Sequence, residues 1–166
     1  MKTKPLLVAA ILLFAGISSG ADQYSKREPI PLAAGAFFAL SVADINASGA
    51  WYREKLGLEV TLKPPRSGPA DVLVLEGGGL IVELIQHDAA RPLAKFTPPV
   101  SDPVNVHGFF KAGVMVDDFD AVLATLRQRG VDIAHGPFAA KEGRRANFII
   151  TDNAGNLIQF FGPNPR

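Results

Sequence analysis

The sequence contains no cysteine, and this absence excludes several kinds of chemistry. No disulfide can link its segments, and no thiolate can act as a nucleophile or hold a metal ion. The Gly-x-Ser-x-Gly pattern of serine hydrolases occurs only at residues 16–20, at the end of an apolar N-terminal run, and there it lacks the strand–turn–helix context of a nucleophile elbow. The triglycine Gly77–Gly79 lies between two expected strands and precedes no helix, so it lacks the context of a phosphate-binding loop.

An excess of either charge is also lacking. Lysine and arginine number 17 against 16 acidic residues, so no basic surface favours a nucleic acid as a partner. Hydrophobic residues make up 48% and charged residues 20% of the 166 residues. This ordinary balance is typical of one globular domain with a hydrophobic core.

An apolar run near the N-terminus is too short for a membrane-spanning helix, which needs about 20 residues. It extends over residues 6–17, follows two lysines, and is succeeded by the small residues Ser19-Gly20-Ala21. This order is typical of a secretory signal peptide. We therefore expect residues 1–21 to be cleaved, and the mature protein to be periplasmic or secreted and without membrane association. An uncleaved anchor is the alternative, whereas a lipoprotein anchor is excluded because no cysteine follows.

The rest of the chain shows one order of elements twice. Residues 22–35 are expected to form a leader into a domain that spans residues 36–163. In the first half Asp44 is expected to cap a helix that ends at Gly57, and in the second half Asp118 caps a helix that ends at Gly130. A proline-rich linker over residues 88–106 separates the halves. The expected strands are 37–42, 59–63, 70–75, 80–86, 109–116, 131–134, 145–151 and 157–161.

The halves also match in residues, because the segment 42–47 (Val-Ala-Asp-Ile-Asn-Ala) lies over the segment 116–121 (Val-Asp-Asp-Phe-Asp-Ala). A helix after the first strand covers one face of a sheet and leaves the other face free. Two such sheets can bury their free faces by curving toward one another. We therefore predict an α+β fold of two tandem βαβββ modules that form a curved mixed sheet enclosing a cleft.

Three motifs in this order resemble the vicinal oxygen chelate superfamily, which includes glyoxalase I, extradiol dioxygenases, methylmalonyl-CoA epimerase, fosfomycin-resistance enzymes and bleomycin-resistance proteins. They are Ala-Leu-Ser-Val-Ala-Asp at 39–44, Trp-Tyr-Arg-Glu-Lys-Leu-Gly-Leu at 51–58 and Asp-Asn-Ala-Gly-Asn-Leu-Ile at 152–158. The resemblance covers residues 36–163. It implies a small molecule as the partner and a homodimer in which clefts are shared between chains.

The resemblance also implies where a metal ion would bind, since metal enzymes of this superfamily draw ligands from the first and last strand of each half. These positions hold Phe37, Glu83, Lys111 and Gln159. Only Glu83 is a normal ligand, because phenylalanine has no donor atom, an ammonium has no lone pair, and an amide oxygen binds weakly. We therefore predict no cofactor and no metal site, with a divalent ion on non-standard ligands as the alternative.

The three histidines do not restore such a site. His87 and His107 share strand parity with Glu83 and Lys111, but four residues along a strand is about 13 Å, beyond the reach of a ligand. A pair of His87 and His107 across the linker ends lacks a clear third ligand, so we expect exposed strand-end histidines. His135, beside Gly136-Pro137, is expected in a turn.

If the strand register holds, Glu83 and Lys111 face the cleft from opposite halves. We hypothesise that the ammonium pairs with the carboxylate and orients a ligand, or that the two act as catalytic acid and base. A purely structural ion pair is the alternative. The ligand-binding candidates are Phe37, Glu83, Phe109, Lys111, Gln159 and Phe161. Tyr52 is expected in the core. Arg144 and Arg145 follow a turn, where they could clamp a carboxylate at the cleft mouth, but adjacent arginines are more often solvated, so we expect them on the surface.

Three functions follow from these expectations. The first is an exported protein of the glyoxalase and bleomycin-resistance type that binds an apolar or aromatic small molecule without a metal ion. The second is a lyase or isomerase of the same superfamily that uses Glu83 and Lys111 or non-standard metal ligands, so enzymatic activity is left open. The third is a structural or interaction module whose cleft is filled by its own side chains.

Overall fold

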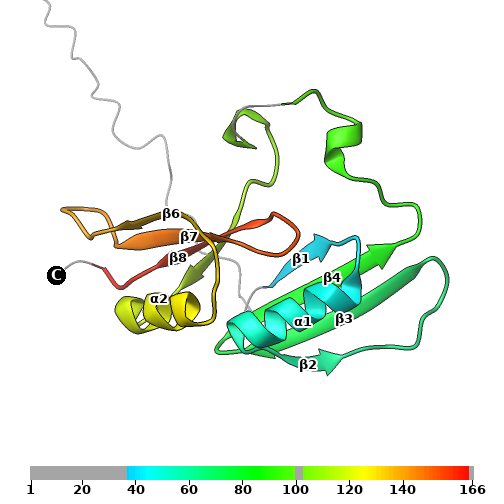
Figure 1. The fold of residues 1–166 in the computed structure, drawn as a ribbon, viewed down its shortest axis with the longest axis horizontal. Coiled ribbons are helices and arrows are strands. Elements are labelled where there is room, and N and C mark those ends of the chain that lie inside the picture. Colours follow the sequence, from blue (N-terminus) through cyan, green and yellow to red (C-terminus); the bar gives the residue numbers. More distant parts are fainter. Residues whose placement is uncertain (1–36, 100–102, 165–166) are drawn as a thin grey trace, which may run out of the picture. The chain divides into compact units, whose positions relative to one another are not determined.

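The computed structural model describes residues 37–99 and 103–164, which form two halves of the same element order (Figure 1). Each half consists of a strand, a helix and three further strands. The expected signal peptide and leader lie outside the described residues. In the part of the chain that is described, no helix is long and apolar enough to cross a membrane.

Each half contains one four-stranded mixed sheet, and neither sheet closes into a barrel. The first sheet has the strand order β1-β4-β3-β2 and the second has the order β5-β8-β7-β6. The pairs β1–β4 and β5–β8 are parallel, and the other pairs are antiparallel. The strands are β1 Phe38–Ser41, β2 Glu59–Leu62, β3 Ala70–Gly77, β4 Leu80–His87, β5 Ala112–Met115, β6 Ile133–Phe138, β7 Asn147–Thr151 and β8 Leu157–Phe161. The predicted duplicated α+β fold is confirmed.

The helices begin where the sequence predicts. The Asp44 carboxylate accepts from the backbone N–H groups of Asn46 (2.9 Å) and Ala47 (3.0 Å), and Asp118 accepts from Ala121 (2.9 Å). These contacts satisfy N–H groups that have no partner within the first helical turn.

The first helix has two parts. The α-helix α1, Ile45–Trp51, continues as a single π-helical turn over Tyr52–Leu56, whereas α2 is an α-helix over Phe119–Gln128. Gly57 ends the first helix with a φ of 72°, a left-handed conformation that favours glycine. The apolar spacing does not distinguish the π-turn from an α-helix because the change spans only one turn.

Three strands of the second half begin later than predicted, among them β7, which starts at Asn147 rather than at residue 145. The strand β5 begins at Ala112 rather than at residue 109, because its four residues pair with the four residues of β8 from Ile158 onward. The strand β6 begins at Ile133, since Val131 belongs to the exit of α2, where its N–H donates to Leu126 O (2.9 Å). His135 lies within β6 opposite Ile149, so its expected place in a turn is wrong.

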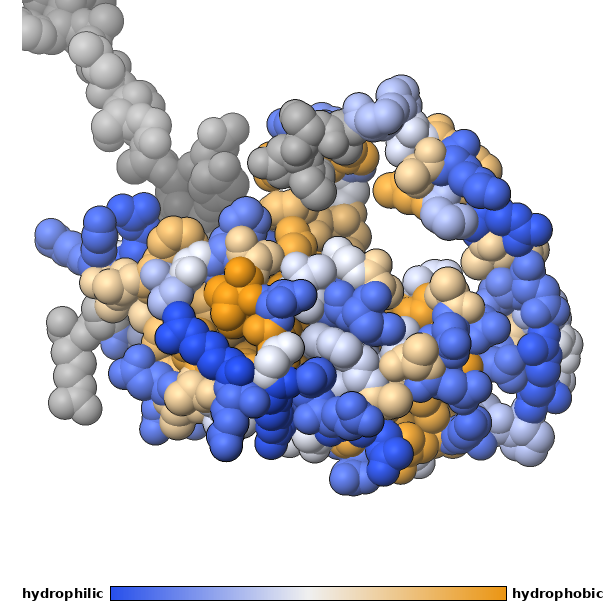
Figure 2. Space-filling model, in the orientation of Figure 1, coloured by the Kyte–Doolittle hydropathy of each residue, from blue (hydrophilic) through white to orange (hydrophobic). Residues whose placement is uncertain are grey.

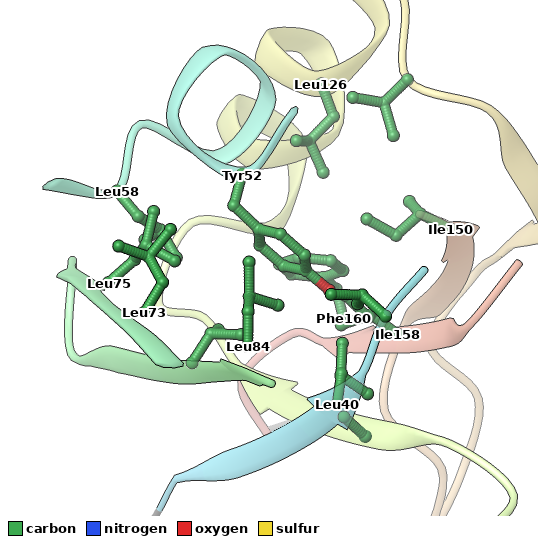
Figure 3. Packing of buried hydrophobic residues seen from close by; sticks show 14 of the residues in the cluster. Leu40, Tyr52, Leu58, Leu73, Leu75, Leu84, Leu126, Ile150, Ile158 and Phe160 are labelled. Atoms are coloured by element: carbon green, nitrogen blue, oxygen red, sulfur yellow. The ribbon is translucent and has the colours of Figure 1, made fainter. Parts of the chain in front are cut away.

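One hydrophobic core joins the two halves on the helix-covered side of both sheets. Figure 3 shows the ring of Tyr52 between Leu84 of the first half and Phe160 of the second, with Leu126 of α2 nearby. We expected the free faces of the sheets to bury each other. Instead, both halves contribute to one core on the helix-covered side, and the free face of the first sheet does not take part in it. The apolar side chains of that face stay half-buried; they are Val72, Val74, Ile81 and Ile85.

Polar contacts across the halves reinforce this core. The Tyr52 hydroxyl donates to Asp152 Oδ2 (2.9 Å), and Asn153 Nδ2 donates to Ser48 Oγ (3.2 Å). Tyr52 is fully buried and Asp152 is 5% exposed. The same carboxylate accepts three further hydrogen bonds, from the backbone N–H groups of Ala154 and Asn156 and from the Asn156 amide. The buried charge is therefore stabilised by hydrogen bonds alone.

The linker between the halves contains two short 3₁₀ turns, Leu93–Lys95 and Pro103–Asn105. Its start is held by Arg66, which contacts Asp71 (2.7 Å) and Asp88 (2.6 Å). Figure 2 shows hydrophobic residues among hydrophilic ones along this segment. The linker therefore presents apolar surface, including Phe96, to solvent.

Candidate functional site

The four positions that the resemblance assigns to metal ligands have the same arrangement in each half. Ala39 pairs with Glu83 in the first sheet, and Gly113 pairs with Gln159 in the second. Phe37 and Lys111 precede these first-strand residues by two positions. Positions 37 and 111, and likewise 83 and 159, are therefore equivalents in the repeat.

Three of the predicted ligand-binding residues line one cavity of about 470 Å³ at the exposed edge of β5, which we call the seam cavity. They are Phe37, Phe109 and Lys111, and Met115 lies on the same wall. Phe37 is 62% exposed and Phe109 is 74% exposed. These rings therefore line the space without filling it, which disfavours a cleft occupied by the chain's own side chains.

Glu83 and Lys111 do not form the expected ion pair. The Lys111 ammonium lies 5.0 Å from the centroid of the Phe110 ring, in a cation–π contact. Glu83 lies half-buried in the middle of β4, whereas Lys111 precedes β5. Among residues 37–99 and 103–164 the only ion pairs are those of Arg66. Lys111 thus contacts an aromatic ring in place of the expected carboxylate, and the role of the two side chains as acid and base stays a prediction.

Gln159 has a positioning role within the second sheet. It is 8% exposed, and its Nε2 donates to Asn147 Oδ1 (2.9 Å). The Asn147 amide in turn donates to the Arg145 carbonyl (3.2 Å). Gln159 therefore orients Asn147, which lines a neighbouring cavity.

That cavity, of about 640 Å³, is lined by Arg144, Arg145, Asn147 and Phe161, and we call it the basic cavity. Arg145 Nη1 contacts the Gly162 carbonyl (3.2 Å) and Met115 Sδ (3.9 Å). Because Met115 also lines the seam cavity, the two cavities adjoin at this contact. Only Phe161 of this group was predicted as a ligand residue.

The sequence left two places open for the arginines, the cleft mouth and the solvated surface, and favoured the surface. Arg144 is indeed exposed, but Arg145 is half-buried. The sequence did contain one signal for Arg145. Arg145 and Asn147 are two residues apart on an extended segment, so their side chains share one face. Arginines next to a turn are common on surfaces, so parity alone did not distinguish the two residues.

The side chains present do not fit the metal site of the superfamily. No group of three or more His, Asp or Glu side chains in the described ranges could hold an ion. Of the four equivalent positions only Glu83 has a strong donor; Gln159 offers only a weak amide oxygen, and its Nε2 donates to Asn147. The histidines are exposed, as expected for His87 and His107, and His87 Nδ1 accepts from the Ala89 N–H (3.0 Å).

The fold and the sequence identify the family of this chain. The family model described as Glyoxalase/Bleomycin resistance protein/Dioxygenase superfamily matches residues 36–160. The chain therefore belongs to this superfamily, and the resemblance of the three motifs is confirmed. No curated protein has a sequence similar enough to match this chain.

Solved structures share the fold. TnmS3, an antibiotic binding protein from Streptomyces sp. CB03234, is 22% identical with a TM-score of 0.57, over 82% of this chain and all of that chain. A glyoxylase/bleomycin resistance protein/dioxygenase domain from Frankia sp. EAN1pec is 17% identical with a TM-score of 0.61, over 80% and 93%. TioX from Micromonospora sp. ML1 is 21% identical with a TM-score of 0.58, over 78% and 98%. At these identities the likeness establishes the fold alone.

Proposed function

We propose that this chain binds an aromatic small molecule that carries an anionic group, and that it does so without a resident metal ion. The observation that carries the proposal is the pair of adjoining cavities, one with two exposed phenylalanines and one with two arginines. The family contains relatives described by their binding of small molecules, such as the antibiotic binding protein TnmS3.

The exposed rings supply the apolar part of the argument. Phe37 and Phe109 present large apolar surfaces to water at the mouth of one cavity. Covering such surface contributes about 25 cal/mol per Å² of apolar area removed from water. A flat aromatic ligand gains most from two rings in one cavity, because offset-stacked and edge-to-face contacts add to the burial term.

The cations supply the polar part. Lys111 lines the seam cavity, and Arg144 and Arg145 line the basic cavity, with none of the three in an ion pair within the described residues. Arg145 is held by Gly162 and Met115 through one nitrogen only, so its other N–H groups remain available to an oxyanion. A carboxylate is suited to such a planar donor.

Export and assembly belong to the same proposal. The order of charged, apolar and small residues in the first 21 positions supports secretion. A homodimer is supported by the half-buried apolar face of the first sheet and by the exposed apolar linker, since contiguous exposed apolar surface favours association. Light scattering on the purified protein would give twice the chain mass, and a monomer would contradict the proposed dimer.

A matched pair of probes tests the ligand class. We expect calorimetry to detect 2-naphthoate binding and weaker binding of the neutral 2-naphthamide, because only the former offers a carboxylate. Phe109→Ala should weaken both compounds, and Arg145→Met should weaken the naphthoate alone. Phe96→Ala is the control, because this exposed phenylalanine lines neither cavity. Absence of binding by both compounds would contradict the proposal.

Metal analysis tests the other part. We expect elemental analysis of the purified protein to find no stoichiometric divalent ion, and a chelator to leave ligand binding unchanged. A tightly bound ion in a one-to-one ratio would overturn metal independence and would direct attention to Glu83 and the histidines.

A further inference from the structure

A further groove of ligand size lies between the β3–β4 turn and α2. This groove of about 350 Å³ is lined by the turn residues Gly77 and Gly78, by Leu80, and by Thr125 and Leu126 of α2, together with other mainly apolar side chains of both halves. Small-molecule sites commonly begin near this size. The groove shares Gly78, Leu80 and Val114 with the seam cavity and extends from there to α2, whose residues line neither the seam nor the basic cavity.

The repeat identifies the counterpart of this groove. Corresponding helix residues are 74 positions apart, as in the reciprocal contact where Lys55 Nζ donates to the Arg129 carbonyl and Arg129 Nη1 donates to the Lys55 carbonyl (3.0 Å). By the same spacing, Thr125 corresponds to Trp51 and Leu126 corresponds to Tyr52. The groove and the region around this aromatic pair are therefore related by the pseudo-two-fold axis.

Side chains of the chain itself occupy the counterpart. The rings of Trp51 and Tyr52 form a T-shaped pair with centroids 5.0 Å apart. The Tyr52 hydroxyl reaches Asp152, and Asn153 of the adjoining turn donates to Ser48. The two aromatic rings thus fill the space between the first helix and the turn of Asp152 and Asn153 in the other half.

The groove lacks each of these groups. Threonine and leucine replace the two aromatic residues, and the triglycine turn offers no side chains. A Cβ added to Gly78 would meet no atom within 4 Å, so this part of the turn borders open space. The missing volume is that of aromatic rings, and the lining that remains is apolar.

We propose that this groove is a second binding site, and that its ligand is an uncharged aromatic compound of one or two rings, of the indole or phenol type. The counterpart defines the shape of the ligand, because an indole and a phenol ring occupy the equivalent space in the other half. Arg129, whose Nη1 donates to the Lys55 carbonyl, is the one charged residue among the described residues of the lining, and apart from it and Thr125 the lining is apolar, which favours an uncharged ring system.

Indole itself is the probe. In a nitrogen–proton correlation spectrum of the purified protein expressed from the full chain, indole should shift the amide signals of α2 and of Gly77, which line the groove but not the seam cavity. Thr125→Trp restores the missing ring and should weaken indole binding by about tenfold or more. Leu62→Trp, on the exposed strand β2, is the matched control and should bind indole like the parent. Val122→Phe fills the same groove from another position, so the test survives if one variant does not fold.

Several results would overturn the proposal. Unchanged indole binding in a folded Thr125→Trp variant is one, and signals that shift only around the seam cavity are another. A third is a dimer that dissociates when the groove is filled, which would identify a second copy of the chain as the occupant. Because the α2 residues line neither the seam nor the basic cavity, shifts and variants on α2 report on the groove independently of the naphthoate test.

Discussion

The buried hydrogen bond between Tyr52 and Asp152 leads to a prediction about alkaline pH. Burial, and next to it the Asp152 charge, raise the pKa of Tyr52 well above its ordinary value. An unfolded tyrosine ionises near pH 10. Below that pH both states keep the proton and the contribution to stability is complete. Above it only the unfolded state loses the proton, so the free energy of unfolding falls as pH rises.

The magnitude follows from linkage. Each pH unit above the unfolded pKa costs about 1.4 kcal/mol for one proton retained in the folded state, hence roughly 2.5 kcal/mol between pH 10 and 12. Tyr52→Phe removes one of the four hydrogen bonds to the buried carboxylate. A bond to a charged group contributes about 1.5–3 kcal/mol, so the variant should be less stable than the parent by this amount at neutral pH.

The assay uses the fact that the chain has two tyrosines. Tyr24→Phe leaves Tyr52 as the sole phenol, and its ultraviolet absorbance then reports ionisation directly. We expect no tyrosinate signal while the protein stays folded, and its appearance together with unfolding at high pH. In denaturant titrations, the stability difference between the Tyr24→Phe protein and the Tyr24→Phe/Tyr52→Phe protein should shrink above pH 10. A tyrosinate signal with a midpoint near pH 10 in a protein with intact circular dichroism would refute the reasoning.

Further substitutions test the local structure. Asp44→Ala should lower the free energy of unfolding by about 1 kcal/mol, and Asp118→Ala by less, because Asp44 caps two N–H groups and Asp118 caps one; equal costs would contradict this account. Gly49→Ala should cost about 1–3 kcal/mol, since the added Cβ would lie 2.7 Å from the Leu73 side chain. Gly113→Ala is its control and should leave the thermal midpoint nearly unchanged, because its Cβ would meet nothing within 4 Å.

Much of the fold could be predicted from local signals. The caps at Asp44 and Asp118, the triglycine turn and the burial of Tyr52 each depend on a few neighbouring residues, and each is confirmed. Short-range rules of this kind are readable because capping and turn formation depend on nearby backbone groups. The repeat then extended these local predictions to the topology of both sheets.

The arrangement of the site residues was harder to predict from such short-range rules. The pairing of Glu83 with Lys111 was predicted from strand parity, but parity does not decide where a long side chain ends, and the Lys111 ammonium lies over the Phe110 ring. Arg145 could not be assigned to a cavity wall before its contact with Met115, 30 residues away in the chain, was known. The groove between the halves was likewise not predictable, because its lining residues come from segments far apart in the chain.

The sequence alone determined the duplication, the superfamily and the loss of three of the four metal-ligand positions, because residue identity at aligned positions decides these points. Only the tertiary structure decided which faces meet. The halves share a core on their helix-covered side, and Tyr52 and Asp152 fill one side of the pseudo-two-fold axis while Leu126 and the glycine turn leave the other open. Such an asymmetry arises from packing between distant segments. Whether a side chain fills a space or leaves a cavity depends on the side chains that surround it in the folded protein.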